Sequence, residues 1–220
     1  MTNRDLIRKM KMKKNLIGGL VASILGLAFV ISGCDSTRHE STKGVVEPAD
    51  ASVGDIVVFG DIRWYVIAKT DTGYTLLSEK PVIKQAFRKS GYGISTVTWE
   101  EYTVRAWLNE DFYNSKFCDG EKAAIVTSHN TYVEDDYHYE SDCGNDTDDK
   151  VYIFSYSEAL AVSDDTRDCG IDWWVRTPGK YQYDAMYIGL SSPNTIGNSV
   201  DNHMAVRPAI RVRYSGKTVD

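Results

Sequence analysis

The chain has 220 residues, which is enough for one globular domain and a short leader. Its hydrophobic content of 42%, with 14 tyrosines and 5 tryptophans, is typical of a packed core and excludes wholesale disorder. The net charge of -6 is unevenly distributed, because residues 1–15 contain six basic side chains and one acidic side chain. The remaining 19 basic and 30 acidic residues give a net charge near -11. Such an acidic surface repels phosphate backbones, so we expect no nucleic-acid partner.

Residues 1–34 have the three parts of a secretory signal: a basic head, an apolar run from Leu16 to Ile31, and small residues before Cys34. The run of 16 residues is shorter than the roughly 20 that a spanning helix needs, although an uncleaved membrane anchor remains an alternative. The end of the run, Val30-Ile31-Ser32-Gly33-Cys34, resembles the lipobox of bacterial lipoproteins. This resemblance implies lipidation at Cys34 and an anchor on the extracytoplasmic face of the bacterial cell membrane.

Composition divides the rest of the chain into three parts. Residues 35–50 are polar and contain Gly44 and Pro48, as is typical of a flexible tether. Residues 51–214 have the apolar patterning of a single domain, and residues 215–220 form a tail.

The domain is expected to mix strands with short helices. Three β-rich runs separated by Asp/Gly turns predict an antiparallel meander of 56–59, 64–68 and 74–78, and Pro81 argues against a strand directly after it. Thr98 and Glu101 have capping-box spacing, which predicts a helix over 99–108. The other expected elements are helices at 119–126 and 155–162 and strands at 151–154, 173–174, 185–188 and 206–212.

An acidic, aromatic loop spans residues 129–149. Calcium takes six to eight oxygen ligands, so this loop is a candidate calcium site, although it lacks EF-hand spacing and could be only a solvated charge run. The candidate ligands are Asp142, Asn145, Asp146, Asp148 and Asp149. We expect no other cofactor.

Five motifs occur in a fixed order along the domain: 54–60 (Gly-Asp-Ile-Val-Val-Phe-Gly), 98–109, 145–152, 173–179 (Trp-Trp-Val-Arg-Thr-Pro-Gly) and 206–209 (Val-Arg-Pro-Ala). Together they resemble a bacterial family of domains of unknown function that is common in Firmicutes surface proteins. The resemblance implies an α+β, C-type-lectin-like fold with antiparallel sheets, two or three short helices, long loops and paired terminal strands. The cysteines are not part of that pattern, and no lectin-type Glu-Pro-Asn or Trp-Asn-Asp sugar motif occurs.

The segment 172–212 is the candidate binding region. Adjacent tryptophans on an extended segment point to opposite faces, so one could anchor the core while the other meets a second layer or solvent. The Ser/Asn/Gly-rich stretch 191–203 is typical of a loop on a fixed scaffold. We expect it to bind a cell-wall glycan, a peptide or a surface protein. The candidate contacts are Trp174, Arg176, Tyr181, Tyr183, Tyr187, Asn194, Asn198 and Asn202.

Arg176 and Arg207 each lie close to a proline at the end of an expected strand. A guanidinium group has five donors, so the alternative to ligand contact is a structural role on loop carbonyls or on a buried carboxylate such as Asp55.

Cys143 and Cys169 could form a disulfide between the acidic loop and the segment before the two tryptophans. Cys118 would then be left over, whereas a reducing habitat would keep all three as thiols. Serine-hydrolase, nucleotide-binding and zinc-protease motifs are absent, so we do not expect catalysis. The alternative is an extracellular enzyme related to formylglycine-generating-type folds, with a cysteine- or metal-based site.

Overall fold

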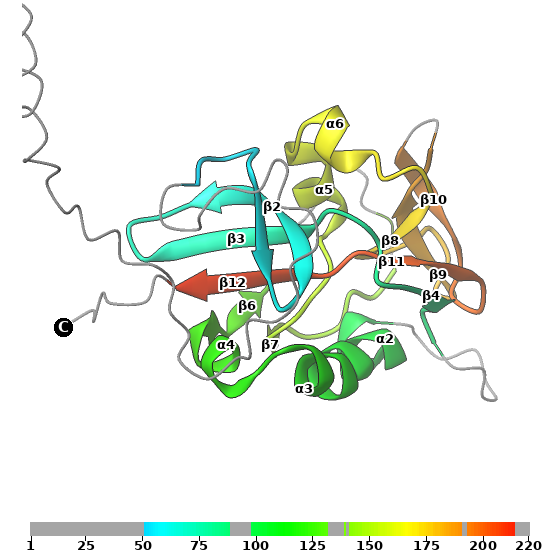
Figure 1. Ribbon diagram of the computed structural model, residues 1–220. Coiled ribbons are helices and arrows are strands. Elements are labelled where there is room, and N and C mark those ends of the chain that lie inside the picture. Colours follow the sequence, from blue (N-terminus) through cyan, green and yellow to red (C-terminus); the bar gives the residue numbers. More distant parts are fainter. Residues whose placement is uncertain (1–50, 89–97, 132–138, 140, 191–192, 214–220) are drawn as a thin grey trace, which may run out of the picture.

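A computed structural model describes residues 51–88, 98–131, 139, 141–190 and 193–213 (Figure 1). The predicted signal peptide, the predicted lipidation site at Cys34, the predicted tether and the tail at 215–220 lie outside these residues. Within the described part of the chain, no helix is both long enough and apolar enough to cross a membrane.

The first sheet contains the predicted meander. Strands β1 (Ile56–Phe59), β2 (Ile62–Lys69) and β3 (Gly73–Ser78) pair in antiparallel order. Gly60 and Asp61, which join β1 to β2, have φ values of 62° and 56°. A two-residue hairpin with this left-handed geometry matches the right-handed twist of its strands, which is why Gly and Asp occupy it.

The C-terminal strand β12 (Ala209–Arg213) extends this sheet, which has the order β1-β2-β3-β12-β5, with β5 at Ile125–Val126. β12 pairs with β3 from Ala209–Leu77 to Arg213–Gly73, and on its other side it pairs with β5. The expectation that the first and last strands pair is therefore wrong. The meander turns the edge of β3 toward β12, and β1 lies at the outer edge of the sheet.

The second sheet has the order β10-β9-β8-β11-β4. Its strands are β10 (Pro193–Ser199), β9 (Asp184–Ile188), β8 (Trp173–Pro178), β11 (His203–Val206) and β4 (Ile83–Ala86). Only the β8–β11 pair is parallel. Two expectations fail here, because the 191–203 region contains β10, paired with β9, and a strand does form shortly after Pro81.

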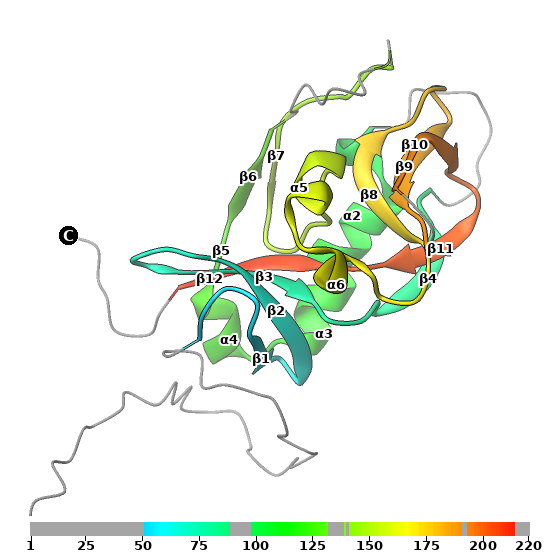
Figure 2. The same ribbon diagram turned by 90° about the horizontal axis from the view of Figure 1, so that it is seen from above.

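The predicted closing strand at 206–212 is two strands in two different sheets, as Figures 1 and 2 show. Arg207, fully buried at the junction, donates to the carbonyl oxygens of Ser78 (2.9 Å), Glu79 (3.4 Å), Thr166 (2.9 Å) and Arg167 (3.0 Å). Its guanidinium group lies 5.0 Å from the centre of the Trp173 ring. Arg207 therefore has a structural role on backbone carbonyls, most of them at the ends of β3 and α6 rather than in loops, and its burial lowers its pKa.

The predicted helix at 99–108 is interrupted. It consists of η2 (Trp99–Glu101) and α2 (Thr103–Trp107), with Tyr102 extended between them at ψ 135°. Thr98 makes no capping hydrogen bond, so the predicted capping box is not formed. The break lets the Tyr102 ring enter the core beside Trp99, where it is 1% exposed. Burial of this ring raises its pKa well above the usual tyrosine value.

Five further short helices follow in the part of the chain that the structure describes. They are η3 (Leu108–Phe112), α3 (Tyr113–Lys116), α4 (Asp119–Ala124), α5 (Tyr156–Ala161) and α6 (Asp164–Arg167). In Figure 1, α2, α3 and α4 lie on one side of the β11–β12 path, and α5 and α6 lie on the other. The segment 151–154 is not a strand, because within it Tyr152 forms only an isolated bridge with Ala209.

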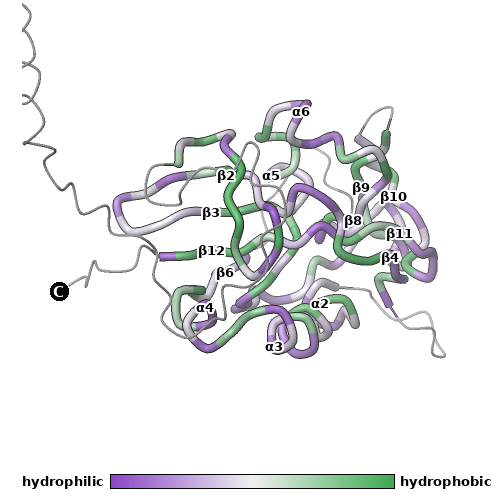
Figure 3. The backbone as a smooth tube through the Cα atoms, viewed as in Figure 1, coloured by the Kyte–Doolittle hydropathy of each residue, from purple (hydrophilic) through white to green (hydrophobic). Residues whose placement is uncertain are grey.

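One hydrophobic core, which includes the buried Trp64, Trp173 and Trp174, joins both sheets and the helices. Figure 3 shows the continuous hydrophobic stretch of β1, which contributes Val57 and Phe59 to this core. A third, two-stranded sheet consists of β6 (Ser128–Asn130) and β7 (Thr147–Asp149), which pair in antiparallel order. The prediction of an α+β fold with mostly antiparallel sheets and short helices is therefore confirmed.

Candidate functional site

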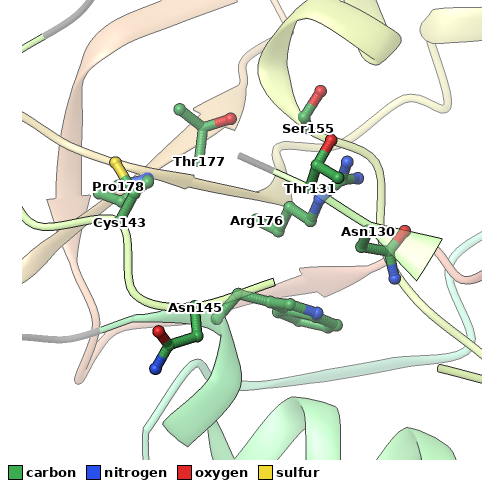
Figure 4. A pocket seen from close by; sticks show the side chains of 9 residues that line it. Asn130, Thr131, Cys143, Asn145, Ser155, Arg176, Thr177 and Pro178 are labelled. Carbon is green, nitrogen blue, oxygen red and sulfur yellow. The ribbon is translucent and has the colours of Figure 1, made fainter. Parts of the chain in front are cut away.

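Three of the sequence motifs meet at one pocket (Figure 4). Its cavity volume is about 30 Å³. Its polar lining is Asn130, Thr131, Asn145, Ser155, Arg176 and Thr177, and its less polar lining is Trp99, Cys143 and Pro178. A space of this size holds a small chemical group rather than a whole sugar ring or side chain of average size.

A buried carboxylate fixes the floor of the pocket. Asp149 is 1% exposed and accepts hydrogen bonds from Trp99 Nε1 (3.0 Å), Arg105 Nε (2.7 Å) and Asn130 Nδ2 (2.8 Å). Thr147 Oγ1 donates to it at 2.7 Å, and Asn109 Nδ2 donates at 3.3 Å. This network holds η2, α2, β6 and β7 together, and it positions two of the residues that line the pocket.

Asn109 connects the network to the chain that follows Asp149. Its Oδ1 accepts from the backbone N–H groups of Lys150 (2.7 Å) and Val151 (3.1 Å), and its Nδ2 donates to the carbonyl of Val151 (2.9 Å). Residues from the 98–109 and 145–152 motifs are therefore in direct contact.

Arg176 forms the opposite wall of the pocket. It comes from β8, and its side chain is only 7% exposed. Its Nη1 donates to the carbonyl of Ile153 (3.0 Å) and forms an ion pair with Glu158. Figure 4 shows the guanidinium group near Thr131 and Asn130.

Residues 143–145 form the rim. Glu100 accepts from the backbone N–H of Asn145 (3.3 Å) and from its Nδ2 (2.9 Å), which anchors the rim to η2. Gly144 has φ +73°, and a Cβ placed on it would lie 2.6 Å from the Cβ of Thr98. Only a glycine suits this position, because the conformation is left-handed and the approach to Thr98 is close.

The predicted disulfide is wrong, because Cys143 and Cys169 are both thiols. Cys143 lines the pocket described above, whereas Cys169 lines a second cavity of about 240 Å³ beside Trp173 and Leu190. Each donates to a carbonyl two residues away, Ser141 for Cys143 and Ile171 for Cys169, both at 3.4 Å. Burial raises the pKa of the Cys169 thiol, although the nearby Arg207 charge opposes that shift.

The structure does not bring the five candidate calcium ligands to one point. On β7 the side chains alternate, so Asp149 faces inward and Asp148 faces solvent. Asp148 and Asp146 both pair with His129, and Asp142 accepts from the backbone N–H of Gly144. Asn145 is held by Glu100, as described above. In the part of the chain that the structure describes, no three His, Cys, Asp or Glu side chains are grouped to hold a metal.

The predicted ligand contacts separate into buried and accessible residues. Trp174 is fully buried with its Nε1 on the carbonyl of Gln85 (3.2 Å), so its expected ligand contact is wrong. Trp173 is 1% exposed and Trp174 is fully buried, so of the two expected surroundings for the second tryptophan, a second layer or solvent, solvent does not apply. Tyr187 is half-buried, and the backbone of Asn194 pairs with it across β9 and β10.

Asn198 and Asn202 bond to each other rather than projecting freely. Asn202 Nδ2 donates to Asn198 Oδ1 at 2.6 Å, and the same oxygen accepts from the backbone N–H of Ser199 at 2.9 Å. These contacts stabilise the turn that follows β10.

Among the predicted contacts, Tyr181, Tyr183 and Asn202 are exposed to solvent. Tyr181 and Tyr183 are 47% and 48% exposed, and their rings are stacked with centroids 5.5 Å apart and planes within 6°. Lys180 Nζ lies 5.6 Å from the centre of the Tyr181 ring. The turn that carries them is fixed by Ser141 Oγ, which donates to the carbonyl of Gly179 at 2.7 Å. Pro178 lines the pocket, and Tyr181 and Tyr183 follow Pro178 closely in the sequence.

Several pocket residues were absent from the predicted ligand contacts. Trp99, Thr177 and Pro178 belong to the recognised motifs, so the motifs were a usable signal for them. Asn130, Thr131 and Ser155 carry no comparable sequence signal, because long-range folding alone brings them to the pocket.

A family model described as a domain of unknown function (DUF6273) matches residues 72–170. The matched region begins just before β3 and extends through α6, and it includes six of the nine pocket residues. No curated protein and no solved structure matches the chain.

Proposed function

We propose that this protein is a lipid-anchored binding module on the extracytoplasmic face of the bacterial membrane, with a C-type-lectin-like domain of the kind found in Firmicutes surface proteins. The lipobox-like sequence ending at Cys34 supports the anchor. A sheet that contains both the N-terminal meander and the C-terminal strand supports the fold assignment, although β12 pairs with β3 rather than β1.

The observation that carries a binding function is the exposed tyrosine pair. Two parallel rings, each about half exposed, present flat apolar faces next to hydroxyl groups. Planar side chains of this kind stack on sugar rings at little cost in side-chain entropy. Ile196, which is 55% exposed on the neighbouring strand β10, adds apolar surface. We therefore propose a cell-wall glycan as the ligand, contacted by Tyr181 and Tyr183.

A rigid support makes this surface suitable for binding. Gly179 donates its backbone N–H to the carbonyl of Asp184, and Lys180 donates to the carbonyl of Ile196. The turn is thus hydrogen-bonded at both of its ends, and the tyrosines are ordered before any ligand arrives. Such preorganisation lowers the entropic cost of binding.

The test is retention of the full-length protein, solubilised in mild detergent, on purified cell-wall glycan. Tyr181→Ala and Tyr183→Ala should each weaken retention by about 2- to 10-fold, from the loss of one aromatic stacking contact. Val58→Ala is the matched control, because Val58 is 44% exposed on β1 of the other sheet. Equal retention of all four proteins would refute glycan binding by this surface.

A further inference from the structure

The geometry points to a second recognition element: the pocket beside Arg176 binds a terminal carboxylate that carries a small apolar substituent. This inference is independent of the proposed glycan contact, because it rests on different side chains and predicts binding of small acids.

The first step concerns the donors of Arg176. A guanidinium group has five N–H donors, and in Arg176 only those of Nη1 are used. Within the described residues, Nε and Nη2 have no hydrogen-bond acceptor, although the side chain is only 7% exposed. Neither nitrogen is among the fully enclosed side-chain atoms that lack a partner in the described residues, so both reach solvent and can meet water or a ligand in the pocket.

The second step concerns geometry. The Nε and Nη2 edge of arginine presents two parallel N–H groups that match the two oxygens of a carboxylate. The guanidinium group is held in place by its bonds to Ile153 and Glu158 and by the Tyr152 ring, whose centre lies 5.9 Å from its Cζ. The edge is therefore fixed before any anion arrives.

The third step concerns the acidic groups nearby, which could fill the site from within. The Asp149 carboxylate is already saturated by five donors, and Glu158 occupies only the Nη1 side of Arg176. Among the described residues, therefore, neither carboxylate occupies the unused edge, which can bind an external group.

The fourth step concerns size and the opposite wall. The cavity of about 30 Å³ accommodates a carboxylate and little more than a methyl group. Trp99, Pro178 and Cys143 supply an apolar wall for such a substituent. The ligand class is therefore a short acid with a small group next to its carboxylate, as at an alanine terminus or in a lactyl group.

The experiment uses the full-length protein in mild detergent and measures alkylation of Cys143 by mass spectrometry, with Cys169 in the separate cavity as the internal control. The probes are N-acetyl-alanine in both enantiomers and lactate, each compared with its uncharged amide. We expect at least one of the acids to slow alkylation of Cys143 several-fold, with half-protection near millimolar concentrations, and to leave Cys169 unchanged. Comparing protection by N-acetyl-alanine with protection by lactate shows whether an alanine terminus or a lactyl group fits the pocket better.

Two variants decide whether Arg176 is responsible. Glu158→Gln removes the competing charge while keeping an acceptor for the backbone N–H of Ser155, so protection should require several-fold less acid. Arg176→Lys keeps the charge but loses the paired donors, so protection should require at least tenfold more acid. Should Arg176→Lys fail to fold, Glu158→Gln alone decides. The proposal is overturned if no acid protects Cys143, if the amides protect as well as the acids, or if Glu158→Gln does not strengthen protection.

Discussion

Replacing Asp149 by alanine should destabilise the protein more than any change to its neighbouring acidic residues. The substitution leaves two buried donors, Trp99 Nε1 and Asn130 Nδ2, without their acceptor. Each such loss costs roughly 1–3 kcal/mol. The Thr147 hydroxyl can rotate to another acceptor, and the side chain of Arg105 is 27% exposed and can be rehydrated, so both add less.

The expected loss is therefore about 3–5 kcal/mol, the range found when one partner of a buried ion pair is removed. Against a typical total of about 5–15 kcal/mol, that is enough to leave much of the protein unfolded at physiological temperature. Urea denaturation of the purified protein, followed by circular dichroism, measures the change in the free energy of unfolding.

Asp148→Ala is the matched control, because its carboxylate is 70% exposed and, among the described residues, bonds only to the exposed His129. It should change the free energy of unfolding by less than about 0.5 kcal/mol. A cost below about 1 kcal/mol for Asp149→Ala would show that the network contributes little to stability, and the account of the pocket floor would then be incorrect.

Two further predictions concern the rim and the exposed strand pair. Gly144→Ala should lower the free energy of unfolding by more than about 2 kcal/mol, since its Cβ would meet Thr98 at 2.6 Å. Gly170→Ala is the control: with φ +77° and no atom within 4 Å, it should lower this free energy by only about 1 kcal/mol. Equal unfolding free energies of the two variants would contradict the proposed close contact. For His129, the hydrogen bond from its ring to Asp148 raises its pKa, with a further contribution from Asp146. The stabilisation is thus present below the ordinary histidine pKa near 6.5 and is lost as the pH rises through the raised value. An NMR titration should show a histidine pKa that falls on Asp148→Asn, and an unchanged value would contradict the pairing.

The sequence was informative where local chemistry decides the structure. The Gly-Asp turn after 56–59 predicted the first hairpin, because a left-handed two-residue turn needs such residues. The helix that begins after Ser155 formed as expected, since Ser155 and Glu158 satisfy each other's backbone groups. The same spacing at Thr98 and Glu101 failed, because burial of the Tyr102 ring in the core outweighs a local cap.

The candidate site was less predictable. The motifs include Arg176 and the segment before Asp149, which contribute to the pocket lining, whereas the predicted contact at Trp174 is fully buried. The expected pairing of Cys143 with Cys169 failed because the two thiols line separate cavities. Periodicity in the sequence does not show which distant residues come together, because strands from distant parts of the chain place each of these residues.

By itself, the sequence determined the α+β composition, the first meander, the exposed tyrosines and a leader that resembles a lipoprotein signal, since each follows from residues close together in the chain. Only the tertiary structure decided that the segment around Arg207 belongs to two sheets, that Asp149 is a buried hydrogen-bond centre, and that Arg176 faces a pocket. These outcomes depend on which distant groups compete for burial and for hydrogen bonds, and that competition is resolved only when the whole core is packed.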